Sequence, residues 1–188
     1  MRGNRFASLS HKRTLRNDRL EHDEYETPPD VVKLLTDHVK FTGPILDPAC
    51  GSMRLLNAVV LQTNLLCEGT DIALNIDYLA ESRQWPGDVI TNPPYHKGMA
   101  DAFVSRALAT TSGKVAMLLQ ADFMFGSDRS KCLHQHFPPE VVIAVPWRIR
   151  FFIGASDERI SSQAYNHCWF VWNNRLMQRP ETKLILPY

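Results

Sequence analysis

The stretch DVITNPPY, residues 88–95, decides the fold. Val89, Ile90 and Thr91 are β-branched, which predicts a short buried strand. The consecutive prolines Pro93 and Pro94 fix the backbone and donate no ladder hydrogen bonds, so the strand must end in a rigid turn. Asn92 and Tyr95 flank the prolines with side chains that can form hydrogen bonds. A stiff polar turn directly after a buried strand predicts a binding or catalytic site at the carboxyl end of that strand.

Outward from this strand, strand-like and helical patterns alternate along the chain. Strands are predicted over residues 45–46, 65–71, 89–91, 115–119, 141–145 and 167–172, and helices over residues 28–39, 55–60, 98–110 and 128–136. This alternation predicts right-handed βαβ units and an α/β fold with a doubly wound, Rossmann-like sheet, mostly parallel with an antiparallel strand near the C-terminus. Turns at Asp47, Asp71 and Asn92 each follow a strand, so we expect them to meet at one edge of the sheet.

Size and composition exclude several classes of protein. With 188 residues, 44% hydrophobic and 22% charged, the chain fits one globular domain and neither a fibrous nor a disordered protein. Its longest apolar run, residues 141–147, is too short to cross a bilayer, and no secretory signal is recognisable, so no membrane partner is expected. Four cysteines without a CxxC pair exclude a disulfide or zinc framework and indicate a cytoplasmic protein.

A cluster of metal-binding residue types occurs at residues 132–136 (CLHQH). Residues two apart on a helix lie on different faces, and no second cluster of ligands follows in the sequence. We therefore expect no metal site.

Residues 1–24 are predicted to form an N-terminal arm of uneven charge. The first 20 residues contain six basic side chains and one acid, and the next six residues, EHDEYE, contain four acids. Two interpretations stay open. The arm is either a solvated tail that the acidic run partly neutralises, or a basic segment that contacts nucleic-acid phosphates.

The tetrapeptide at residues 92–95 matches the pattern (D/N/S)PP(Y/F/W), which follows the fourth strand in enzymes that methylate amino groups with S-adenosylmethionine. The chain thereby resembles the DNA adenine-N6 methyltransferases. The resemblance implies that the Asn92 side-chain oxygen and the Pro93 carbonyl accept the N–H groups of the adenine amine. It also implies that Pro94 stiffens the loop and that Tyr95 stacks on the extruded base. Methyl transfer to the amine is then direct, without a covalent intermediate on the protein.

The turn DPACGS, residues 47–52, resembles motif I of the same enzymes. The resemblance implies that Asp47, Pro48, Ala49 and Gly51 lie beside the methionine end of S-adenosyl-L-methionine, the expected cofactor. A dinucleotide is not expected, because the chain has no GxGxxG run. Met53 departs from the family, which commonly has a small residue at this position.

Three further segments complete the implied cofactor site. Asp71 is placed to accept both ribose hydroxyls, with a simple strand-end cap as the alternative, and Ile72 would lie against the adenine ring of the cofactor. Asp77, in the run DYL, resembles the acid of the third motif, which bonds the amino group of the cofactor. Thr27 and Pro28, in the run YETP, resemble motif X, which packs over the methionine end.

The motif order, X before I before NPPY, resembles the gamma group of these enzymes. Residues 25–188 are expected to form a single methyltransferase domain without a separate target-recognition domain. Residues 146–167, rich in aromatic side chains and arginines, are predicted to form a hairpin over the active face, with an ordinary packed hairpin as the alternative. Substrate contacts are expected from Lys97, Arg148, Arg150 and Phe151.

These patterns together predict transfer of a methyl group to the N6 amine of adenine in DNA, either a duplex with a flipped base or a single strand. Few side chains are left to read base edges, so we expect short or relaxed specificity, or specificity supplied by a homodimer mate or another partner. Methylation of RNA adenine or of a protein glutamine stays open. So does a catalytically degenerate methyltransferase fold that serves as a binding subunit.

Overall fold

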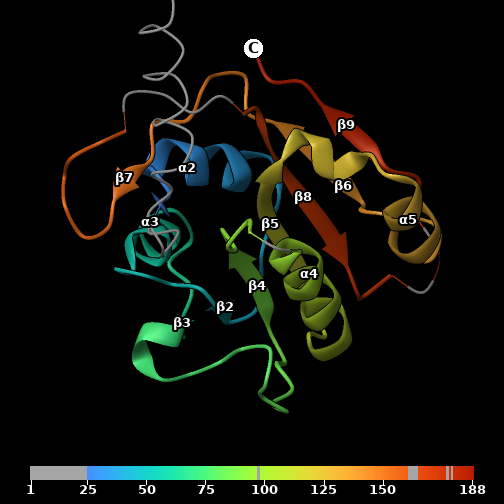
Figure 1. The fold of residues 1–188 in the computed structure, drawn as a ribbon, viewed down its shortest axis with the longest axis horizontal. Helices are drawn as coiled ribbons and strands as arrows, with labels where there is room; N and C mark the ends of the chain where they lie inside the picture. Colours follow the sequence, from blue (N-terminus) through green and yellow to red (C-terminus); the bar gives the residue numbers. More distant parts are fainter. Residues whose placement is uncertain (1–24, 97, 161–164, 177, 179) are drawn as a thin grey trace, which may run out of the picture.

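The computed structural model describes residues 25–96, 98–160, 165–176, 178 and 180–188, so the predicted N-terminal arm lies outside the described residues. Its strands are β1 (Tyr25–Glu26), β2 (Ile45–Asp47), β3 (Cys67–Gly69), β4 (Asp88–Thr91), β5 (Lys114–Gln120), β6 (Val141–Ala144), β7 (Phe152–Ile153), β8 (His167–Asn173) and β9 (Lys183–Ile185). Its helices are α2 (Pro29–His38), α3 (Arg54–Thr63), α4 (Met99–Thr110) and α5 (Ser127–Arg129), with the short turns η1 (Ile72–Leu74), η2 (Ala121–Met124) and η3 (Ser130–His134). Figure 1 shows them around one central sheet.

The central sheet has seven strands in the order β3-β2-β4-β5-β8-β6-β9. All neighbouring pairs are parallel except those of β8, which runs antiparallel to both β5 and β6. The β5–β8 ladder is the longest, from Lys114 opposite Asn173 to Gln120 opposite His167. The predicted Rossmann-like sheet, mostly parallel with an antiparallel strand near the C-terminus, is thus confirmed.

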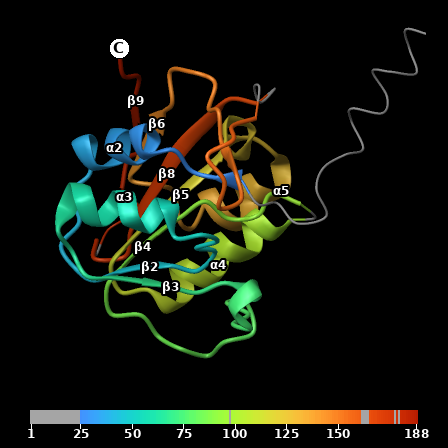
Figure 2. The same cartoon turned by 90° about the vertical axis from the view of Figure 1, so that its left-hand side faces the viewer.

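Helices cover both faces of the sheet because successive strand residues point to opposite sides. On one face, α2 and α3 pack against side chains such as Ile90 and Leu118, and the Trp169 Nε1–H donates to the Val31 carbonyl of α2 (2.9 Å). On the other face, α4 packs through Phe103 and its neighbours. Figure 2 shows α2 and α3 on one side of the sheet and α4 on the other. None of the described helices is long and apolar enough to span a membrane.

Three local features differ from the sequence-based expectations. The strand β9 was not predicted, because its three residues are mostly exposed and show no alternation. The helix expected over residues 128–136 is the short α5 followed by a wider π turn, η3. Residues 70–87, all of them described, form the short turn η1 and no α-helix, which agrees with the absence of a predicted helix there. The expected hairpin over residues 146–167 is present in part, but its strand β7 pairs with β1.

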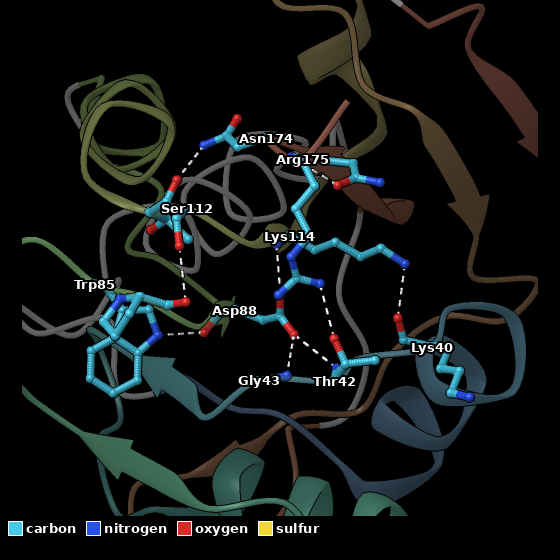
Figure 3. Close-up of polar contacts among 12 residues, drawn as sticks. Lys40, Thr42, Gly43, Trp85, Asp88, Ser112, Lys114, Asn174 and Arg175 are labelled. Atoms are coloured by element: carbon cyan, nitrogen blue, oxygen red, sulfur yellow. Dashed lines mark hydrogen bonds and ion pairs between the residues drawn. The ribbon is translucent and has the colours of Figure 1, made fainter. Parts of the chain in front are cut away.

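A buried carboxylate fastens the amino-terminal ends of β4 and β5, at the edge opposite the predicted site. Asp88 is completely buried at the start of β4. Its carboxylate accepts hydrogen bonds from four groups (Figure 3): the backbone N–H of Thr42 (3.1 Å), of Gly43 (3.2 Å) and of Lys114 (2.7 Å), and Nη2 of Arg175 (2.8 Å). Asp88 thereby ties three separate loops to the sheet.

Candidate active site

The carboxyl ends of β2, β3 and β4 meet at one edge, as predicted, because the three strands are parallel neighbours. Asp47 is the last residue of β2, Asp71 lies two residues beyond β3, and Asn92 directly follows β4. The turn after β2, which we call the motif I loop (residues 47–53), lies against the end of β3. There the Cys50 N–H donates to the Thr70 carbonyl (3.0 Å) and the Thr70 N–H donates to the Asp47 carbonyl (2.9 Å). Two segments that the resemblance assigns to the cofactor therefore form one continuous surface.

Three acids surround the motif I loop, and we call them the carboxylate trio: Glu26, Asp47 and Asp71. Each accepts a hydrogen bond from a backbone N–H of the loop: Asp47 from Ala49 (3.1 Å), Asp71 from Gly51 (2.9 Å) and Glu26 from Ser52 (2.6 Å). Glu26 was not among the site residues predicted from the sequence. The one available signal was its place directly before Thr27 and Pro28 in the motif X segment.

The trio makes the site strongly electronegative. Asp47 is 1% exposed, and burial raises the pKa of its carboxyl from 3.8 to about 7, with the charges of Glu26 and Asp71 acting in the same direction. The Thr91 side chain and the Ala49 N–H partly oppose this rise in pKa. None of the trio forms an ion pair with a described side chain. The described residues also contain no group of His, Cys, Asp or Glu arranged to hold a metal ion. The trio is therefore suited to a ligand that carries its own positive charge.

The shape of the motif I loop depends on Gly51. Its φ of 47° lies in the left-handed region, and a Cβ at this position would collide with the Glu26 carboxylate. Met53, the departure from the family pattern, also has a left-handed backbone (φ 70°) and serves as the N-cap of α3. Burial raises the pKa of the Cys50 thiol to about 11, so the thiol is protonated and Cys50 serves in packing.

Thr27 and Pro28 directly follow β1 in the sequence. Both are buried, and Pro28 is the N-cap of α2. The Thr27 hydroxyl is buried and has no hydrogen-bond partner among the described residues. An unpaired buried hydroxyl is costly, so a polar ligand in the site would satisfy it.

The loop after β4 is held in a defined orientation. Asn92 Nδ2 donates to the Tyr25 carbonyl of β1 (3.0 Å), and Asn92 Oδ1 accepts from the Tyr95 hydroxyl. The same hydroxyl lies 2.9 Å from the Leu118 carbonyl, so its single proton has two acceptors. The Tyr95 ring packs 5.8 Å from the ring of His167, whose pKa burial lowers to about 4. His167, which sequence analysis did not assign to the site, is therefore a neutral packing partner of the loop.

A cleft of about 390 Å³ opens beside Tyr95, a volume within the range of about 300–1,000 Å³ common for small-molecule sites. Its walls come from α4, from the end of β5 and from the segment that follows β5. They include Asp101, Gln120, Phe125 and Arg129. The cleft therefore adjoins the loop that the sequence singles out for chemistry.

The remaining predicted cofactor residues lie on the surface near Asp71. The Asp71 carboxylate also accepts from the Ala73 N–H (2.9 Å), so it caps η1 as well as facing the motif I loop. Ile72 is 70% exposed. Asp77 is exposed and accepts from the Leu79 N–H (3.0 Å). Ile72 and Asp77 are therefore accessible from solvent beyond the end of β3.

The predicted substrate residues separate into two groups. Arg148 and Arg150 are exposed after β6, whose carboxyl end lies at the same edge as those of β4 and β5. Phe151 differs from the expectation, because its ring is completely buried between Tyr25 (6.1 Å) and His167 (5.3 Å) and offers no face to a substrate. Lys97 lies outside the described residues.

Comparison with known proteins gives relatives by structure only. No protein-family model matches the chain, and no curated protein sequence matches it. A protein from Listeria monocytogenes named as a class I S-adenosylmethionine-dependent methyltransferase has 19% identity and a TM-score of 0.64, over 96% of this chain and 70% of that one. The chain has this methyltransferase fold.

Two further similar structures come from restriction systems. The methyltransferase subunit of a type I restriction–modification system from Streptococcus thermophilus has 18% identity and a TM-score of 0.62, over 87% of this chain and 47% of that one. The M protein of the type I restriction enzyme EcoKI has 14% identity and a TM-score of 0.56, over 82% of this chain and 45% of that one. The chain thus spans about half the length of these subunits.

Proposed function

We propose that this protein transfers a methyl group from S-adenosyl-L-methionine to the N6 amine of adenine in DNA. The observation that carries the proposal is the position of the Asn92–Tyr95 loop at the edge where the carboxylate trio also gathers. One edge of the sheet thereby brings together an electronegative ligand site and a rigid pair of hydrogen-bond acceptors.

The residues present fit the proposed cofactor. S-adenosylmethionine carries an ammonium and a sulfonium group, and it supplies the methyl group when bound. The trio offers three carboxylates without a cationic side-chain partner among the described residues, and the Thr27 hydroxyl has no hydrogen-bond partner among them either. We assign Asp47, Pro48, Ala49, Gly51, Thr27 and Pro28 to the methionine end, with Glu26 added, and Asp71, Ile72 and Asp77 to the nucleoside end.

The orientation of Asn92 supports its role as an acceptor for an amine. Because Nδ2 is fixed by the Tyr25 carbonyl, the amide oxygen is the group directed toward Tyr95, and Tyr95 in turn lines the cleft. When the Tyr95 hydroxyl donates to the Leu118 carbonyl, Asn92 Oδ1 becomes available for an N–H of the substrate. The second acceptor is the Pro93 carbonyl, which the rings of Pro93 and Pro94 hold in place. Both acceptors are therefore preorganised to bind the amine with its lone pair directed at the methyl group.

The choice of DNA as substrate is supported by the exposed Arg148 and Arg150 at the active edge, because arginines contact phosphates. The fold shared with M subunits of type I restriction enzymes supports the same choice. Lys97 and the basic residues of the arm are further candidates for phosphate contacts in this proposal.

Transfer of a tritiated methyl group tests the proposal. The purified protein is incubated with labelled S-adenosylmethionine and, separately, with duplex DNA, single-stranded DNA, RNA and a protein mixture, and the product nucleosides are separated. We expect N6-methyladenine in DNA. Label in RNA adenine or in protein glutamine would show that the substrate is RNA or protein and not DNA. Cofactor binding without transfer to any acceptor would identify a degenerate binding subunit.

A further inference from the structure

The segment that follows β5 borders the cleft and is firmly braced. We call residues 121–126 the β5 loop. Arg129 donates from Nη1 to the carbonyls of Phe123 (3.1 Å) and Phe125 (2.9 Å), and its guanidinium lies 4.1 Å from the centre of the Phe123 ring. Arg129 is itself held by two hydrogen bonds to the Asp101 carboxylate (2.6 and 2.8 Å). The backbone of the loop is therefore fixed to α4 on one side and to the core on the other.

This rigid loop presents an apolar side chain to solvent. Phe123 is 4% exposed, whereas Phe125, two residues later, is 68% exposed, and Met124 between them is 36% exposed. Phe125 stands at the mouth of the cleft that Tyr95 also lines. Single exposed apolar residues are common on protein surfaces, but this one is held in position beside a site. A rigid scaffold that positions an exposed loop residue is typical of functional surfaces.

The charges around Phe125 indicate which part of a nucleic acid would meet it. Asp122 and Asp128 are exposed on either side, and the nearby cation Arg129 is neutralised by Asp101. Phosphates would be repelled there, so the β5 loop is unsuited to the backbone of DNA. An aromatic ring suits the faces of the bases.

We propose that Phe125 inserts into the DNA duplex and fills the space left by the adenine that enters the cleft beside Tyr95. Apolar side chains that occupy an opened base step stabilise distorted duplexes in this way. The inference rests on the proposed function and deepens it, because it names paired duplex DNA as the substrate. Phe125 touches neither the cofactor nor the reacting atoms. Its role is to stabilise the extruded state.

The test compares Phe125→Ala and Phe125→Trp with a matched control, Phe137→Ala. Phe137 is also exposed, at 55%, but it precedes β6 at the opposite edge of the sheet. Methyl transfer is measured on a paired duplex, on the same duplex with an abasic site opposite the target adenine, and on the single strand. Extrusion is followed separately by the fluorescence of 2-aminopurine at the target position.

Loss of one base–aromatic stack predicts a decrease of about 5- to 150-fold in the duplex rate for Phe125→Ala. The rate on the single strand, which needs no extrusion, should change less than about twofold. The decrease on the abasic duplex should lie between those on the paired duplex and the single strand. Phe125→Trp should retain the duplex rate, and Phe137→Ala should match wild type. The 2-aminopurine signal should fall for Phe125→Ala, while the slope of affinity against salt stays unchanged, because no phosphate contact is lost.

An equal loss on duplex and single strand would overturn the insertion of Phe125, since it would indicate stacking on unpaired bases. An unchanged duplex rate for Phe125→Ala would overturn it as well, while leaving the proposed methylation intact. Wild-type protein that binds cofactor but methylates no DNA would instead refute the proposed function, and the insertion with it.

Discussion

Replacing Asp88 with alanine should destabilise the protein more than any other single change at the amino-terminal edge of the sheet. The carboxylate is completely buried and accepts from three backbone N–H groups and from Arg175. Each donor left without a partner costs about 1–3 kcal/mol when it stays buried, and breaking a buried charge pair costs about 3–5 kcal/mol. Thr42 and Arg175 are exposed enough to regain water, so the loss comes mainly from the N–H groups of Gly43 and Lys114, about 2–6 kcal/mol together. We expect a loss of about 3–5 kcal/mol in the free energy of unfolding.

Urea unfolding followed by circular dichroism measures this loss, and a thermal midpoint about 6–20 °C lower should accompany it in a chain of this size. Arg175→Ala is the matched comparison. It should cost less, because the carboxylate keeps three backbone donors, and the double variant should be less destabilised than the sum of the two single variants. A loss below about 1 kcal/mol for Asp88→Ala, with an unchanged denaturant slope, would refute the view that this carboxylate fastens the sheet.

Three further predictions concern the active edge. Asn92→Ala should lower turnover about 100-fold or more, because one preorganised acceptor is lost. The cofactor affinity of this variant, measured by calorimetry, should stay at the wild-type value. The control variant Asn57→Ala, at an exposed position of α3, should keep the wild-type turnover. The pKa of Asp47, about 7 against an ordinary 3.8, means that the folded state binds the extra proton, so the free energy of unfolding should fall as pH rises from about 4 to 7 and then level off. A bound cation favours the ionised carboxylate, so cofactor affinity should rise over the same window, and Asp47→Asn should flatten both curves. Gly51→Ala should weaken cofactor binding at least tenfold, because the added Cβ displaces Glu26 from the motif I loop. It should also lower the free energy of unfolding by about 1–2 kcal/mol, the cost of the left-handed backbone for a residue with a Cβ. A cofactor affinity equal to that of the wild type would contradict the described loop geometry.

The meeting of Asp47, Asp71 and Asn92 at one edge could be predicted from the sequence because the information for it is local. Asp47, Asp71 and Asn92 each lie within two residues of the end of a strand, and parallel strands bring their carboxyl ends together whatever the details of packing. Glu26 could not be assigned in the same way. Its contact with Ser52 depends on where β1 lies, and β1 is placed by pairing with β7, far along the chain.

Phe151 illustrates the opposite error. Arginines and aromatic residues in one segment predicted a shared surface, but an extended chain directs alternate residues to opposite sides. Arg150 is exposed and Phe151 is buried, and only knowledge of the partner strand fixes which set faces inward. Phe125 had no signal in the sequence at all, because its exposure follows from how Arg129 holds the loop after β5.

The two residues of β1 have a consequence for the order in which the polypeptide matures during synthesis. Tyr25 holds the Asn92 amide, Glu26 holds the motif I loop, and both residues pair with β7 at residues 152–153. A nascent chain that ends before β7 contains every proposed cofactor residue and the whole NPPY turn, yet it lacks the strand that fixes β1. Long-range pairing of this kind forms late in folding. The growing chain should therefore become able to bind its ligand in one step, once residues up to 153 have left the ribosome, and not gradually with each added strand.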